Sequence, residues 1–202
     1  MNKVFIMLVG EPASGKTATN WSLYNYIGST YKNGTPTMFC YDVIYPQVIN
    51  TKEFKSKEFP KENLKNDYIR DQIIAIGQQA VSRWAIKKDE DASSVMIYDD
   101  RNLTVYDRKR ILGRLPEGTI KVAIHMNRIQ AFCRNHNGNS GHREVSTNTL
   151  IRASRTIQQP IYDEGFHVIH HVDANHHLQD YKVISKIASF PNNFFSVNKL
   201  PE

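Results

Sequence analysis

Short apolar runs alternate with longer segments of helical periodicity along most of the chain. The apolar runs predict strands at residues 4–9, 37–41, 94–100, 120–125 and 167–173. Apolar residues spaced three and four apart predict helices at residues 17–27, 61–88, 104–115, 127–134, 147–158 and 181–190. Strands alternating with helices are typical of an α/β domain with a parallel sheet. We therefore expect a single α/β domain over residues 1–202, with a parallel sheet of about five strands and helices on both faces.

Three segments carry more local expectations. Gly28 is expected to end the first helix. Residues 43–60 contain two prolines and a lysine-rich run, and they predict either a solvated loop or short helix, or a basic insert that faces the substrate. The tail at residues 191–202 is expected to dock on the body of the domain.

The most informative motif lies between the first strand and the first helix. Residues 10–17 read GEPASGKT, which matches the phosphate-binding loop pattern G-x-x-x-x-G-K-[ST]. In such a loop, successive backbone N–H groups and a helix N-terminus attract phosphate. Lys16 would reach the β- and γ-phosphates, and the Thr17 hydroxyl would ligate Mg²⁺. The predicted nucleotide contacts from this region are Gly10, Ala13, Ser14, Gly15, Lys16, Thr17 and Ala18. The loop predicts ATP and Mg²⁺ as cofactors.

Acidic residues follow two of the predicted strands. Asp42 comes directly after the second strand, and Asp99 and Asp100 end the third. In open α/β sheets the ligand lies beyond the carboxyl ends of the strands, so Asp42 is expected to face the phosphates. Asp99 and Asp100 both qualify by position as the acid that holds Mg²⁺. The alternative for this pair is a helix cap or an exposed position.

A stretch rich in Gly, Asn and Ser at residues 134–146 predicts a mobile lid loop over the phosphates. Arg134 and Arg143 flank this loop, and an arginine there could neutralise charge on the transferring phosphoryl group. The alternative is a disordered surface loop with solvated arginines.

Composition adds weaker constraints. Lys and Arg outnumber Asp and Glu by 26 to 20, which is consistent with a polyanionic partner but also with nucleotide binding alone. The two cysteines have no CxxC spacing, so neither a zinc site nor a disulfide framework is indicated. Histidines at 170, 171, 176 and 177, with Asp173, invite a metal hypothesis that strand alternation disfavours. No signal peptide or membrane span is recognised, and the expected location is the cytoplasm, that of the host if a phage encodes the chain.

Several motifs stand in a fixed order along the chain: the phosphate-binding loop, Asp42, the run DRNLT at residues 100–104, the lid and the run PIYDEGF at residues 160–166. Together they resemble the phage-type polynucleotide kinases, a family of P-loop kinases. Relatives of that family include zeta-toxin-like kinases and phage kinases that act on hydroxymethyluracil in DNA. The resemblance spans residues 3–173.

The resemblance implies roles for particular residues. By position, Asp42 matches the carboxylate that orients the acceptor hydroxyl and acts as general base. Asp100 matches the acid near the metal, Arg143 the lid arginine, and Arg134 an arginine that approaches the nucleotide. The family often has an arginine a few residues after the base, and residues 43–45 contain none. Arg101 is also unusual within the DRNLT run, where small residues are commoner.

The predicted activity is an ATP-dependent kinase that transfers the γ-phosphoryl group to a hydroxyl on nucleic acid. The acceptor is either a 5-hydroxymethyluracil base in DNA or a 5′-hydroxyl end. The lack of an arginine at residues 43–45 favours hydroxymethyluracil. A kinase for a nucleoside, sugar nucleotide or other metabolite is the alternative, and an NTP-driven switch ATPase ranks third.

Overall fold

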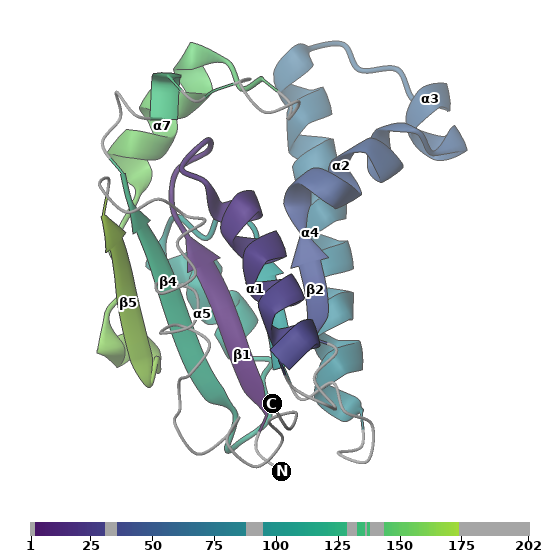
Figure 1. Ribbon diagram of the computed structural model, residues 1–202. Coiled ribbons are helices and arrows are strands. Elements are labelled where there is room, and N and C mark those ends of the chain that lie inside the picture. The colour runs from purple at the N-terminus through teal and green to yellow at the C-terminus, as the bar shows by residue number, and fades with distance from the viewer. Residues whose placement is uncertain are drawn as a thin grey trace.

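A parallel sheet forms the centre of the computed structural model, which describes residues 3–30, 36–87, 95–128, 133–135, 137 and 144–173. Within these residues the strand order is β2-β3-β1-β4-β5, and each strand is parallel to its neighbours (Figure 1). The strands are β1 (Val4–Val9), β2 (Thr37–Cys40), β3 (Val95–Asp99), β4 (Ile120–Asn127) and β5 (Val168–Asp173). The expected five-stranded parallel sheet is confirmed.

Helices cover both faces of this sheet. They are α1 (Lys16–Thr30), α2 (Tyr41–Ile49), α3 (Lys52–Ser56), α4 (Glu62–Ile86), α5 (Val105–Leu112) and α7 (Thr147–Thr156), with a short 3-10 helix η1 (Tyr162–Glu164). Helix α1 packs on one face, and α4 and α5 pack on the other. Helices α2, α3 and α7 lie beyond the carboxyl ends of the strands (Figure 1). The α/β fold with helices on both faces is therefore as predicted.

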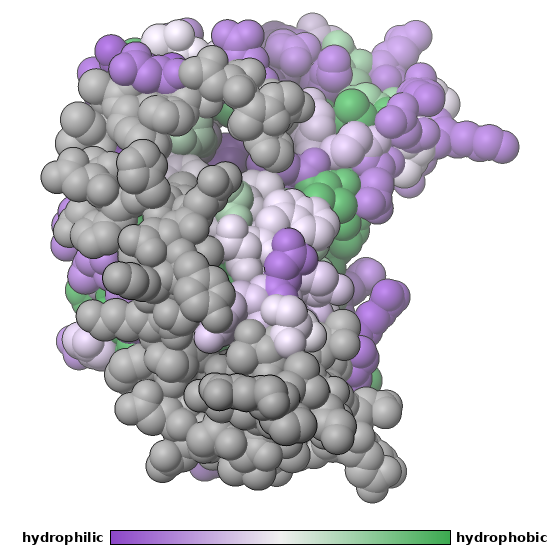
Figure 2. Space-filling model, in the orientation of Figure 1, coloured by the Kyte–Doolittle hydropathy of each residue, from purple (hydrophilic) through white to green (hydrophobic). Residues whose placement is uncertain are grey.

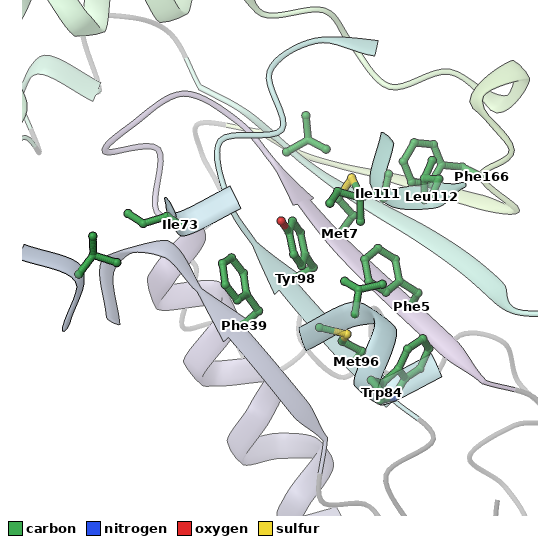
Figure 3. Packing of buried hydrophobic residues seen from close by; sticks show 14 of the residues in the cluster. Phe5, Met7, Phe39, Ile73, Trp84, Met96, Tyr98, Ile111, Leu112 and Phe166 are labelled. Atoms are coloured by element: carbon green, nitrogen blue, oxygen red, sulfur yellow. The ribbon is translucent and has the colours of Figure 1, made fainter. Parts of the chain in front are cut away.

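The alternation of side chains along β1 divides the core into two layers. Val4, Ile6 and Leu8 pack with α1, whereas the alternate residues Phe5, Met7 and Val9 pack with α4 and α5. Aromatic residues concentrate in the second layer (Figure 3). Every residue of β1 is buried, as expected for a central parallel strand covered on both faces.

Several element boundaries differ from the sequence expectation. Strand β2 ends at Cys40 instead of residue 41, and α2 begins at Tyr41, so Asp42 lies in the first turn of a helix. Gly28 lies inside α1 and does not end it. Asn127 belongs to β4 and is not helical, and α7 ends at Thr156, two residues early. Residues 43–60 contain most of α2 and the whole of α3.

Other expectations fall on residues outside the described ranges. These include Arg143, most of the lid loop, the predicted helix at 181–190 and the tail at 191–202. Of the helices that the structure describes, none combines the length and apolar character that a membrane span requires.

Candidate active site

The loop between β1 and α1 has a backbone shape that suits phosphate. Ala13 and Gly15 both have positive φ angles, of 61° and 93°. Such residues next to a helix N-terminus turn successive N–H groups into one concave surface, which is the geometry of an anion nest. A Cβ atom on Gly10 would lie 2.7 Å from Ser14 Oγ and 2.9 Å from Met126 Cβ. Gly10 is therefore needed because the loop closes tightly against itself and against β4.

Lys16 is the first residue of α1, directly after this loop. Its buried Nζ donates hydrogen bonds to the carbonyl oxygens of Gly10, at 2.9 Å, and of Glu11, at 2.8 Å. Burial lowers the pKa of Lys16, and the nearby carboxylates of Asp99 and Asp42 oppose that shift. The cation is held where an anionic ligand could replace the carbonyl groups.

Two buried polar side chains of the loop have atoms without hydrogen-bond partners among the described residues, Ser14 Oγ and Glu11 Oε2. Buried polar groups are rarely left unpaired in native proteins. A hydroxyl in this position can donate to a phosphate oxygen. Burial also raises the pKa of Glu11, although Lys16 opposes the shift. Both the backbone geometry of the loop and the unpaired Ser14 hydroxyl are therefore compatible with a bound phosphate group.

The Thr17 hydroxyl lies between two carboxylates. Its oxygen is 3.0 Å from Oδ2 of Asp42 and 3.0 Å from Oδ2 of Asp99. One hydroxyl has one proton, so it can donate fully to only one of them at a time. Asp42 and Asp99 thus bring negative charge together beside the loop. Oxygen atoms of this kind are the ligands that Mg²⁺ prefers, so the donor set fits that ion.

Asp99 is the more buried of these two acids. It is 2% exposed, and it also accepts a hydrogen bond from Cys40 Sγ at 3.4 Å. Burial raises the pKa of Asp99 to about 6, and the charge of Lys16 and the bond from Thr17 partly oppose this shift. A nearby cation would favour the charged form of the carboxylate.

Asp99 and Asp100 have different hydrogen-bond partners. Asp99 contacts Thr17, whereas Asp100 accepts hydrogen bonds from the Arg101 N–H at 2.6 Å and from the Tyr98 hydroxyl at 3.4 Å. Adjacent residues at a strand end point to opposite faces, which explains the division. The resemblance implied Asp100 beside the metal, but the carboxylate in contact with Thr17 is that of Asp99.

The loop after β3 is tied to the phosphate-binding strand by Asn102. This residue has a positive φ of 48°, and its Nδ2 donates to the carbonyl oxygen of Leu8 at 2.8 Å. Sequence reasoning missed this role, because a polar residue after a strand reads as solvated. Its only signal was its place in the DRNLT run.

Sequence reasoning also missed a buried ion pair. Arg108 is fully buried, and its Nε and Nη2 lie 2.7 and 2.8 Å from the two carboxylate oxygens of Glu164. Its guanidinium further donates to the carbonyl oxygens of Asn102, Leu103, Gln158 and Gln159. It therefore joins the loop after β3 to the segment after α7.

The described part of the lid region supplies one predicted arginine. Arg134 is exposed and lies in the short helical segment 133–135. The neighbouring Cys133 is fully buried and interacts electrostatically with Glu11 and Lys16. Burial is the main cause that raises the pKa of this thiol to about 11. Arg134 therefore follows a residue that lies close to the phosphate-binding loop.

The histidines of β5 are placed as strand alternation requires. Nδ1 of His171 lies 3.1 Å from Nδ1 of His125 on β4. His176 and His177 lie outside the described ranges. In the part of the chain that the structure describes, no group of three or more His, Cys, Asp and Glu residues is arranged to hold a metal ion.

The sequence matches no protein-family model and no curated protein. Solved structures do match, over nearly the whole chain. A gluconokinase from Sinorhizobium meliloti is 16% identical with a TM-score of 0.55, over 93% of this chain and 94% of that one. Kti12 from Chaetomium thermophilum, in complex with ADP-AlF3, is 14% identical with a TM-score of 0.62, over 91% and 96%. Shikimate kinase from Acinetobacter baumannii, in complex with shikimate, is 13% identical with a TM-score of 0.53, over 94% and 92%. The chain therefore has the fold of P-loop kinases.

Proposed function

We propose that this protein is an ATP-dependent kinase that transfers the γ-phosphoryl group of ATP to a hydroxyl group of a small molecule. The observation that carries the proposal is the position of Asp42. Its carboxylate lies 3.0 Å from the Thr17 hydroxyl, at the end of the phosphate-binding loop. A carboxylate beside the terminal phosphate is where a kinase needs its base.

In the proposed reaction, the acceptor oxygen forms a bond to the γ-phosphorus while the bond from that phosphorus to the β,γ-bridging oxygen breaks. ADP leaves, and the Asp42 carboxylate takes the proton of the acceptor hydroxyl. The loop N–H groups and Lys16 hold the phosphates, and positioning with charge neutralisation supplies most of the rate. Arg134 and Arg143 are proposed to add positive charge at the transferring group.

Mg²⁺ is proposed to bind beside Thr17 and Asp99, where it would draw charge from the phosphate oxygens. Asp99 takes this role in place of Asp100 because its carboxylate, not that of Asp100, contacts Thr17.

Two observations favour a small-molecule acceptor over nucleic acid. Among the solved structures of this fold are a gluconokinase and a shikimate kinase, whose names identify small acceptors. In addition, the lysine-rich region at residues 52–65 carries three acids among its five lysines, so its formal net charge is only +2. Hydrophilic residues gather around α3 (Figure 2), but they do not form a surface of one charge sign.

A nucleic-acid acceptor, the main prediction from the sequence, becomes the second candidate, and the resemblance of residues 100–104 and 160–166 to polynucleotide kinases supports it. The test is ADP formation from ATP and Mg²⁺ with three sets of acceptors. These are a metabolite panel of sugars and hydroxy acids, 5′-hydroxyl oligonucleotides, and duplexes that contain hydroxymethyluracil. ADP formation that depends on a metabolite supports the proposal. ADP formation that depends only on an oligonucleotide moves the protein to the second candidate, and equal rates with no acceptor refute both.

A further inference from the structure

A cavity of about 340 Å³ lies between the start of α2, helices α4 and α5, and the loop after β3. We call it the α4–α5 pocket. It borders the candidate active site at two points, because Tyr41 precedes Asp42 and Asp100 follows Asp99. Its volume is at the small end of the range for metabolite-binding sites, roughly 300–1,000 Å³. Its lining includes Tyr41, Arg70, Asp100, Arg101, Tyr106 and Arg110.

Two arginines of the pocket are placed next to aromatic rings. The guanidinium carbon of Arg101 is 5.5 Å from the ring centre of Tyr41, and that of Arg110 is 6.0 Å from the ring centre of Tyr106. A guanidinium over an aromatic face is oriented without losing its charge. These contacts therefore restrict both cations and leave their N–H groups available.

Each acid of the pocket has a partner among the other lining residues, and Asp100 also interacts electrostatically with Arg101. Asp107 accepts hydrogen bonds from both the backbone N–H and the hydroxyl of Thr104, in the cap of α5. Asp71 lies 3.5 Å from Arg70. Asp100 accepts from the Arg101 backbone N–H and from the Tyr98 hydroxyl. Within the described ranges, no carboxylate lies within 4.0 Å of the guanidinium of Arg101 or Arg110.

One donor of the pocket is buried and unpaired. The Nε atom of Arg110 is inaccessible to solvent, and it has no hydrogen-bond partner among the described residues. Leaving a buried charged donor unpaired is costly, and an acceptor group that reached the Arg110 guanidinium would lower that cost. Carboxylates and phosphates match the fork of a guanidinium.

We propose that the α4–α5 pocket binds an anionic group of the acceptor through Arg101 and Arg110, so that the substrate is a small hydroxylated organic anion. The inference rests on the proposed kinase function and deepens it. Tyr41 and Asp42 are consecutive in the first turn of α2, so an acceptor held against Tyr41 lies next to the residue that is proposed as the base. Arg101 and Arg110 would then make the anion contact. In the polynucleotide kinases that the sequence resembles, an arginine often lies a few residues after the base, and residues 43–45 contain none.

The test is calorimetric binding of matched anionic and neutral ligands to the full chain. Gluconate is compared with glucose, and glycerol 3-phosphate with glycerol, so that the two pairs separate carboxylate from phosphate recognition. The variants are Arg110→Gln and Arg101→Gln. The matched control is Lys109→Gln, which removes the same charge from an exposed residue of the same helix. Thermal unfolding of each variant checks that it folds, and Arg101→Gln keeps the test valid if Arg110→Gln does not.

The expected result is tighter binding of at least one anion than of its neutral partner. Loss of either arginine should weaken that binding on the order of 10- to 100-fold, because charge-assisted hydrogen bonds are lost. Lys109→Gln should change it by less than about twofold, as for an exposed charge. Equal binding of anionic and neutral partners, binding of none of the four, or an unchanged affinity in both arginine variants would overturn the inference.

A separate readout distinguishes failure of the kinase proposal from failure of this inference. If an anion binds through Arg110 but no acceptor stimulates ADP formation, the kinase proposal fails and the anion site stands. If a neutral acceptor is phosphorylated at the same rate by wild type and Arg110→Gln, the kinase proposal stands and the anion site fails.

Discussion

Replacing Glu164 with alanine removes the partner of a fully buried cation. Arg108 would keep its bonds to backbone carbonyl oxygens but lose two charge-assisted bonds, of 2.7 and 2.8 Å, to the Glu164 carboxylate. The backbone N–H of Ile161, which donates to Glu164 Oε1 at 3.0 Å, would also lose its acceptor. The variant therefore leaves a buried charge and a partly buried donor unsatisfied.

The expected cost follows from that geometry. Breaking a buried ion pair by removing one partner costs about 3–5 kcal/mol, because the remaining charge stays in a medium that solvates it poorly. In a chain of this length, 1 kcal/mol corresponds to roughly 2–4 °C in Tm. Glu164→Ala is therefore expected to lower Tm by roughly 6–20 °C. Glu164→Gln keeps one oxygen acceptor and should fall between the wild type and the alanine variant.

Urea unfolding at pH 7, followed by circular dichroism, measures this cost. The matched control is Asp163→Ala, because Asp163 is the exposed neighbour of Glu164 in η1. It should change the free energy of unfolding by about 0.5 kcal/mol or less. A cost below about 1 kcal/mol for Glu164→Ala, or equal costs for the two variants, would refute the reasoning. The Arg108–Glu164 ion pair would then not be what holds the loop after β3 to the segment after α7.

Three further changes probe the base, the metal-facing acid and the core. Asp42→Asn should lower kcat on the order of 10²- to 10⁴-fold with little change in ATP affinity, measured by steady-state kinetics and calorimetry; a large loss of ATP affinity alone would contradict its role. Burial raises the pKa of Asp99 to about 6. Without metal, wild type should therefore lose about 2 kcal/mol of stability relative to Asp99→Asn as the pH rises from 4 to 6, in urea titrations at each pH. Wild-type and Asp99→Asn stabilities that change equally with pH would contradict this. A Cβ on Gly77 would lie 2.7 Å from the Tyr98 hydroxyl, so Gly77→Ala should cost about 1–3 kcal/mol in urea unfolding. Gly28→Ala, in the same helical context with open space around it, should be stabilising. Equal effects of the two glycine changes would contradict the packing.

The sequence predicted those features whose cause is local. A run of six buried apolar residues followed by GEPASGKT is sufficient to predict a strand, a phosphate-binding loop and a helix, because loop closure and anion attraction depend on consecutive residues. The cap of α7 is equally local, because the Ser146 side chain accepts from the Thr149 N–H. Such contacts span only a few residues.

Features that depend on distant segments were not predictable. Arg108 reads as part of a basic, solvated helix until Glu164, 56 residues away, is placed against it. Asp99 and Asp100 are equivalent by position, and their roles separate only once α1 covers one face of β3. Gly28 does not end α1, which continues to Thr30. A glycine ends a helix where the backbone turns out of it in the left-handed conformation.

The most direct test of the central claim is transfer of label from γ-³²P-ATP with Mg²⁺, using the acceptor identified by the ADP assay. The account predicts labelled acceptor with the wild type. It predicts on the order of 10³-fold less label, or lower, with Lys16→Ala, and almost none with Asp42→Ala despite retained ATP binding. Label that appears only as inorganic phosphate, or an Asp42→Ala variant that labels the acceptor at the wild-type rate, would contradict it.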